Sequence, residues 1–473
     1  MIDLVFLAFI GFVLVLGLKR PFFWVLAYAY IDILAPQKIG YGIIQSVPVS
    51  LIAFVAAFGG WLLLDGKKGA RFSLRQALML ALLAYCAWTT SRADFPIEAL
   101  EKWEWVWKAL VFAIFLPLTL TTRLRIEGLA LVMTLTVATI VVSAGIKTVL
   151  GGGGYGGLYL FVNNNSGIYE SSTLATVAIA MIPVILWFVR FGSIFPPDWR
   201  VKTFAYALIF ASLLIPIGTE ARTGLLCIAA LGLLMLRDVK QRVLYMIAGA
   251  TLGLAALPFL PQSYYERMAT ITGHQGDQSA STRLAVWEWT IEFAEERPLG
   301  GGFDAYRGNK FAYDMPVVEV QGNTQLIENR EVVDEGRAYH SAIFEMLGEQ
   351  GWPGLILWLW LHALGIIHME KIRRRWKDRV GEGNQWQAPF AAALQMAQII
   401  YLVGSLFQGI AYQPFILMLL GLQIGLWNYL KRIETPEKVP ITERRPRGGA
   451  GAQPTVPSPI APPAHRRPSV SRP

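Results

Sequence analysis

The stretch "IDLVFLAFIGFVLVLGL" at residues 2–18 contains a single charged side chain, Asp3. A helix of this length and composition is long enough to cross the hydrocarbon core of a bilayer. The stretch lacks both a basic leading segment and an A-x-A cleavage pattern. We therefore expect a retained membrane helix and not a signal peptide.

Further apolar runs of this kind follow along the chain. Of its 473 residues, 54% are hydrophobic and 16% are charged, and the mean hydropathy is +0.44. Soluble domains carry about 25% charged residues. We predict an all-α polytopic membrane protein with about 12 or 13 transmembrane helices. The expected segments are 2–18, 22–35, 43–64, 74–90, 104–122, 126–149, 171–190, 203–219, 222–236, 241–258, 342–368, 388–410 and 413–430.

Basic residues in the short connecting loops predict the orientation. Short basic loops remain in the cytoplasm, so the loops that alternate with them are expected in the periplasm of a bacterial inner membrane. This distribution accounts for the net charge of +9, and we expect no nucleic-acid partner. The Lys- and Arg-rich stretches are 65–75, 122–125, 237–242 and 371–379.

Four regions follow from this pattern. We expect an N-terminal transmembrane bundle (1–258), a large periplasmic loop with short helices (259–341), C-terminal transmembrane helices (342–430) and a disordered cytoplasmic tail (431–473), which is rich in Pro, Arg and Ser. The loop is the one long hydrophilic insertion, with 13 acidic and 7 basic side chains. A site is often built on such a loop.

Within the loop, "STRLAVWEWTIEFAEERP" at 281–298 predicts a helix that begins near Ser/Thr caps and ends at a proline. Its apolar residues recur every three or four positions, as on a face turned toward the membrane or the bundle. We expect residues 308–336 to be polar and irregular. The apolar positions are Leu284, Trp287, Ile291 and Ala294.

Three ionisable residues stand at borders between polar and apolar sequence. Arg222, in "GTEARTGLL", is either a snorkelling interfacial arginine or an anion-binding residue at a helix start. Arg283 opens the loop helix, where it either pairs locally or faces the same anion. His340 precedes "SAIFEMLGEQ" and is either an interfacial side chain or a general base, which a helix N-terminus keeps neutral. Glu345 and Glu349 are candidates to orient or buffer it.

Other motifs are less informative. "FVNNNSGIYESS" at 161–172 offers amides, Tyr169 and Glu170, which suit sugar hydroxyls but equally suit a helix cap. "GGGGYGG" at 151–157 lacks the Lys-Ser/Thr ending of a phosphate loop. Tryptophans in "EALEKWEWVWK" at 98–108 indicate interfacial anchoring. The chain has no D-x-D or H-E-x-x-H motif, so we expect no catalytic metal and no cofactor.

Taken together, three of these pieces resemble one family. They are "EARTGLL" after a membrane helix, the loop "STRLAVWEWTIEFAEERPLGGGFDAY", and the loop end H-S-x-x-x-E-x-L-x-E-x-G-x-x-G. The combination resembles the bacterial O-antigen ligase and polymerase superfamily. The opening residues 3–37 and the stretch 161–183 are similar to the O-glycosylation ligases that accompany exosortase systems.

The resemblance implies a GT-C type glycosyltransferase that takes a glycan from undecaprenyl diphosphate. Its acceptor in the ligases is a sugar hydroxyl of the lipid A core. By this resemblance, Arg222 and Arg283 would bind the donor diphosphate and His340 would be the general base of an inverting, metal-independent transfer. Tyr169, Glu170, Tyr306, Tyr339 and Glu345 are candidates for sugar contact or for orienting the site. The sequence departs from the family pattern at two positions. Ser341 stands where many relatives have Asn, and Asn163 stands where many have an acidic residue. Both departures bear on which acceptor is used.

Alternatives remain open. A polymerase would join repeat units on the same carrier, and a protein O-glycosylation ligase would use a protein acceptor. A transporter of lipid-linked glycans would show inverted repeats and charges near the bilayer midplane. The sequence shows no clear repeat, and the candidate charges lie at the predicted outer face, so an enzyme is favoured.

Overall fold

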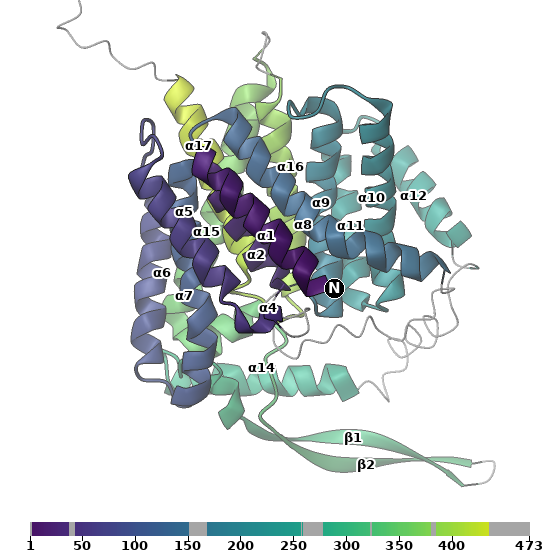
Figure 1. Cartoon of the computed structure of the whole chain (residues 1–473). Coiled ribbons are helices and arrows are strands. Elements are labelled where there is room, and N and C mark those ends of the chain that lie inside the picture. Colours follow the sequence, from purple (N-terminus) through teal and green to yellow (C-terminus); the bar gives the residue numbers. More distant parts are fainter. Residues whose placement is uncertain are drawn as a thin grey trace, which may run out of the picture. The chain divides into compact units, whose positions relative to one another are not determined.

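The computed structural model describes residues 2–36, 43–150, 168–256, 258, 278–321, 324–379 and 385–434. Met1–Ile433 form one compact unit, and a second unit covers Glu434–Pro473. The first unit is helical apart from one pair of strands (Figure 1). Its helices include α1 (Ile2–Lys19), α2 (Phe22–Leu34), α4 (Ile43–Ser46), α5 (Val49–Leu63), α6 (Leu74–Thr90), α7 (Pro96–Thr119), α8 (Arg123–Leu150), α9 (Ser171–Phe191), α10 (Trp199–Gly218), α11 (Arg222–Met235), α12 (Arg242–Ala256), α14 (Gln278–Glu296), α15 (Ala342–Lys377), α16 (Gln387–Ser405) and α17 (Pro414–Glu434).

Every expected membrane segment overlaps a helix in the structure. The segment 43–64 is divided into α4 and α5 at Pro48, which has no N–H to continue a helix. Among the described residues five helices are long and apolar enough to span a bilayer, and five shorter apolar helices accompany them. The prediction of an all-α polytopic membrane protein is confirmed, while the number of crossings stays a prediction. The five long helices are α8, α9, α10, α15 and α16.

Local sequence explains where several helices begin. Ser73 forms a capping box with Gln76 at the start of α6, in which each side chain hydrogen-bonds the other residue's backbone N–H. Pro96 begins α7, where its missing N–H costs nothing. Glu170 and Asp198 accept backbone N–H bonds at the starts of α9 and α10.

The basic stretches gather at one end of the bundle. The sequence predicts this grouping, and which membrane face this end meets stays a prediction. Three contacts across it join segments that are distant in sequence, namely Arg125 with Asp65 at 2.6 Å, Arg123 with Phe191 at 2.9 Å and Arg237 with Glu370 at 3.6 Å.

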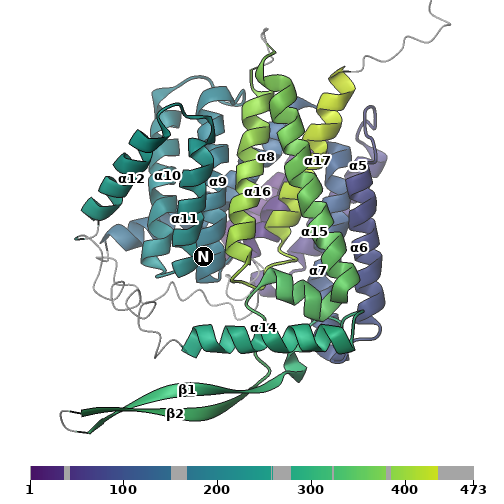
Figure 2. The ribbon, with the colours of Figure 1, turned by 180° about the vertical axis from the view of Figure 1, so that it is seen from behind.

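Helix α14 lies across the opposite end of the bundle in both views (Figures 1 and 2). The predicted helix 281–298 is therefore confirmed, as Gln278–Glu296. Its packed face includes Val286, Thr290 and Ala294, which are buried, whereas Leu284 and Ile291 are exposed. Only part of the predicted apolar stripe thus faces the bundle.

The glycine-rich turn that follows α14 (residues 300–302) hydrogen-bonds to α15. Helix α15 bends at Gly351, whose φ of 61° is one that glycine adopts without strain. Its bend and the missing N–H of Pro353 free two carbonyls of the preceding turn. Gly301 and Gly302 donate their N–H groups to these carbonyls, those of Gly348 and Glu349, at 3.0 and 2.9 Å. The bend thus falls in "GWPG" (351–354), and the turn replaces the helix bonds that are lost there.

The prediction of an irregular segment over 308–336 was wrong. Strands β1 (Lys310–Gln321) and β2 (Thr324–Glu335) pair antiparallel, with Lys310 opposite Glu335 and Gln321 opposite Thr324. The two residues between the strands are Gly322 and Asn323, a dipeptide typical of two-residue hairpin turns. Valine pairs on both strands favour extended backbone despite the many charges.

Candidate functional site

His340 stands between the hairpin and α15. It precedes Ser341, the N-cap residue of the helix, and its φ of 48° lies in the left-handed region, which is uncommon for a residue other than glycine. The backbone before it is held by Trp287 of α14, whose Nε1 donates to the carbonyl of Tyr339 at 2.8 Å. Trp287 also stacks on Phe344, with ring centroids 4.9 Å apart. The turn that presents His340 is therefore fixed from both α14 and α15.

Three charged side chains act on His340. Its side chain is exposed at the surface, yet surrounding atoms desolvate the ring, which is the main reason that its pKa is lowered from 6.5. Arg283 and Arg337 lower the pKa further, and Glu170 raises it. The structure thus brings the predicted histidine close to the predicted loop arginine and to a predicted sugar-contact residue. The imidazole is favoured in its neutral form, as a proton acceptor requires.

Glu170 has two roles in the structure. It caps α9 by accepting from the N–H and the hydroxyl of Thr173 at 2.6 and 2.8 Å. The same hydroxyl is within 2.8 Å of the Gln408 amide, which joins α9 to the end of α16. Beside it, the buried Tyr169 donates its hydroxyl to the carbonyl of Leu34. Tyr169 therefore supports the site from inside, while Glu170 is exposed beside His340.

Arg222 is the first residue of α11. The chain reaches it through Glu220, which has a φ of 51°. Two close approaches place this end of α11 against the first turns of α9. A Cβ on Gly224 would lie 3.0 Å from the Cβ of Ala175, and Cys227 Sγ lies 3.7 Å from the Thr176 hydroxyl. Arg222 therefore lies at the same end of the bundle as Glu170.

Tyr306 and Tyr339 form an edge-to-face pair with centroids 5.6 Å apart. Tyr339 is buried, and its hydroxyl lies so close to Gly348 that a Cβ there would overlap with it. Burial raises the pKa of Tyr339 far above 10.0, and nearby Glu349 raises it further. The phenol stays protonated. Its position fits orienting the site better than direct contact with a sugar.

A buried charge cluster, which the sequence interpretation missed, lies beneath these tyrosines. Lys102 Nζ on α7 is 2.8 Å from Glu345 Oε1 and 2.7 Å from Glu349 Oε1, and 3.7 Å from Asp304. Glu345 also accepts from the N–H of Ala411 at 2.9 Å, and Glu349 from that of Asp304 at 3.0 Å. Glu345, predicted to orient the site, is thus anchored in a cluster that joins α7, α15 and two loops.

A signal for Lys102 does exist in the sequence. It shares one face of α7 with Ala99, Val106 and Ala109, all of which are buried. A lone lysine on an apolar stripe must find an anionic partner. The surrounding tryptophans had favoured the interpretation of an interfacial belt.

Among the described residues, no group of three or more His, Cys, Asp or Glu side chains is arranged to hold a metal ion. Chemically, the site region offers one neutral imidazole, cationic guanidinium groups and an exposed carboxylate. Such a set can accept a proton and stabilise an anion.

Comparison with known proteins divides the chain in two. Residues 1–193 match a family of unknown function (DUF5935), and residues 207–359 match the family described as O-antigen ligase. No curated protein matches the chain. The second match contains Arg222, Arg283 and His340, whereas Lys102 and Glu170 lie within the first. The match over residues 207–359 supports the resemblance to the O-antigen ligase superfamily for that part of the chain.

Proposed function

We propose that this protein is an O-antigen ligase of the bacterial inner membrane. It transfers a glycan from undecaprenyl diphosphate to a sugar hydroxyl of the lipid A core at the periplasmic face. The observation that carries the proposal is His340 at the start of α15, near Arg283 and Glu170, within a chain that carries an O-antigen ligase region. The family match supports ligase- or polymerase-type chemistry in general. The donor, the acceptor and the roles of the individual residues are part of this proposal.

In this mechanism His340 accepts the proton of the acceptor hydroxyl. The oxygen attacks the anomeric carbon, the new glycosidic bond forms, and the bond to the phosphate oxygen breaks. The electron pair leaves with undecaprenyl diphosphate, and direct attack inverts the anomeric centre. General base catalysis of this type contributes about 10²–10⁴-fold.

Arg222 and Arg283 bind the diphosphate and stabilise the charge that develops on it. Guanidinium groups suit this role because they bind phosphate oxygens bidentately. Arg222 begins α11, where the helix dipole also favours an anion. Desolvation lowers the pKa of His340 most and the Arg283 charge lowers it further, so donor binding and base strength are linked through Arg283.

Glu170 and Tyr306 are the sugar-contact candidates nearest to solvent. Tyr169 and Tyr339 support them from buried positions. The carrier's polyprenyl chain is expected to lie against the apolar outer faces of the helices, as membrane lipid does.

The decisive experiment uses the full-length protein, purified in lipid nanodiscs, with an undecaprenyl-diphosphate glycan and lipid A core. His340→Ala, Arg222→Ala and Arg283→Ala should each reduce transfer by about 10²-fold or more while the protein inserts normally. Arg200→Ala is the matched control, because Arg200 lies at the other end of α10 from Arg222. Full activity of His340→Ala would exclude the general-base role.

The same assay without acceptor separates the rival enzymes. Long glycans that remain on the carrier would identify a polymerase, and glycan on an added protein would identify a protein ligase. A chelator should leave the rate unchanged, and a loss rescued by Mg²⁺ or Mn²⁺ would contradict the metal-independent mechanism.

A further inference from the structure

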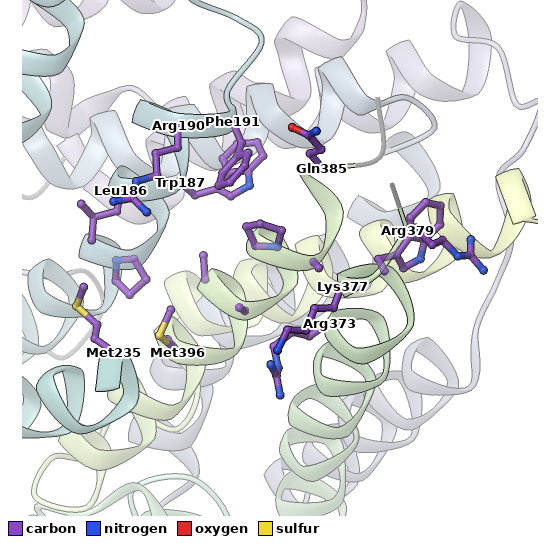
Figure 3. A pocket seen from close by; sticks show the side chains of 16 residues that line it. Leu186, Trp187, Arg190, Phe191, Met235, Arg373, Lys377, Arg379, Gln385 and Met396 are labelled. Carbon is purple, nitrogen blue, oxygen red and sulfur yellow. The ribbon is translucent and has the colours of Figure 1, made fainter. Parts of the chain in front are cut away.

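A pocket of about 640 Å³ lies at the end of the bundle opposite His340 (Figure 3). It is bordered by the last turns of α9, the last turns of α15 and the first turns of α16. Because α15 begins beside His340 and ends at Lys377, the two sites lie at opposite ends of that helix. The pocket therefore cannot belong to the proposed transfer site.

The polar residues of the pocket are predominantly cationic. Arg190 comes from α9, and Lys377 and Arg379 come from the end of α15 and the residues after it. A further lining residue, Arg373, forms an ion pair with Glu370 at 2.8 Å. No acidic side chain is among the described residues that line the pocket. The pocket therefore favours an anion.

The first turn of α16 strengthens this preference. Ala388 and Pro389 line the pocket next to the start of the helix at Gln387, so the positive end of the helix dipole borders the cavity. Figure 3 shows Arg190 on one side of the cavity and Lys377 and Arg379 on the other. The cavity is thus bordered by basic residues from α9 and from the end of α15, and by the start of α16.

Apart from Gln385, the remaining lining is apolar. Leu186 on α9, Met235 at the end of α11 and Met396 on α16 line the pocket beyond the basic residues. Helices α9, α15 and α16 are each long and apolar enough to span a bilayer. The pocket thus combines a cationic rim with an apolar wall, at the end of membrane helices where lipid headgroups lie.

We propose that this pocket binds an anionic phospholipid. Its phosphate lies among Arg190, Lys377 and Arg379, and an acyl chain lies against the apolar wall. A soluble phosphate would satisfy the same charges but would leave the methionine and leucine side chains uncovered. The combination of both surfaces favours the lipid.

The test is a titration of the full-length, detergent-purified protein, with bound lipids counted by native mass spectrometry. Phosphatidylglycerol should be retained in preference to phosphatidylcholine. Replacing Arg190, Lys377 and Arg379 with Gln should weaken that preference by about fivefold for each side chain removed. Ala392→Phe, which fills the pocket without changing charge, should reduce retention of phosphatidylglycerol.

The matched control is the triple variant Lys371→Gln, Arg374→Gln and Arg375→Gln, on the same helix end but outside the pocket lining. It should retain the wild-type preference. Equal loss in the control, no lipid preference in the wild type, or inorganic phosphate that competes as strongly as the lipid would each overturn the proposal. None of these outcomes depends on the transfer reaction.

Discussion

Lys102 Nζ lies 2.7 Å from Glu349 Oε1, and the Glu349 side chain is completely buried. A second carboxylate, Glu345, lies 2.8 Å from the same nitrogen. One ammonium group thus hydrogen-bonds two buried carboxyl groups at the point where α7 meets α15. The pair lies directly beneath Tyr339, whose pKa responds to both carboxylates, and His340 is the next residue. We therefore expect the position of His340 to depend on the packing of this cluster.

Lys102→Met should destabilise the protein by about 3–5 kcal/mol, because two buried carboxylates lose their cation. Glu349→Gln should cost less, since Lys102 and Glu345 remain as a balanced pair. Thermal unfolding in nanodiscs measures both, with Lys108→Met as the control on the same helix. If Glu349→Gln proved the more damaging of the two, the cluster would not be held by charge balance.

The pH dependence of transfer should respond in opposite directions to two neighbours of His340. The base works in its neutral form, so activity falls as pH drops through its pKa, which lies below 6.5. Arg283→Gln removes a charge that lowers this pKa and should move the acid limb to higher pH. Glu170→Gln removes a charge that raises it and should move the limb to lower pH.

Rates measured against pH at saturating donor test this prediction. Arg283→Lys keeps the positive charge. The pH at which activity falls on the acid side should therefore match the wild type, even if the rate is lower. Limbs that shift in the same direction for both neutral variants would show that the titrating group is not His340.

Some of these features were predictable from sequence, and others were not. Hydropathy predicted the membrane helices because a spanning helix is a local property, decided by about 20 consecutive residues. The cluster around Lys102 was missed because its partners lie 243 and 247 positions away, and only packing brings them together. The hairpin was missed because its charged residues obscured a local sequence signal, the Gly-Asn dipeptide between two valine-containing stretches.

Alanine substitutions at two glycines near the site should have very different effects on transfer. A methyl group on Gly348 would overlap with the hydroxyl of Tyr339, whereas one on Gly409 would lie 3.6 Å from the Glu345 carboxylate, an ordinary contact. Gly348→Ala should displace Tyr339 and with it the backbone of His340. We expect transfer to fall by about 10²-fold, since small misplacement of a catalytic group is costly. Gly409→Ala should behave like the wild type.

Both variants should be compared by transfer rate per folded protein, with thermal unfolding measured in parallel. Wild-type transfer by Gly348→Ala would show that the Tyr339 contact does not position His340.

A buried polar chain runs across the interior at Arg75. Its Nη2 donates to Gln423 at 3.0 Å, and Gln423 in turn donates to Gln398 at 3.0 Å. Gln398 then donates to the carbonyl of His362 at 2.9 Å, so the chain joins α6, α17, α16 and α15. Gly365 lies against it, and a Cβ there would be 2.8 Å from both glutamine oxygens.

Gln423→Leu should destabilise the protein by about 1–3 kcal/mol for each buried group that loses its partner. Gly365→Ala should also destabilise it, because the methyl group separates the two glutamines, whereas Gly59→Ala, with open space around its Cβ, should not. Thermal unfolding and transfer rate together decide what the chain does. A structural link lowers the unfolding temperature and leaves the rate per folded protein unchanged. A lower rate at an unchanged unfolding temperature would instead give these polar groups a part in function, as the transporter alternative requires of charges inside the membrane.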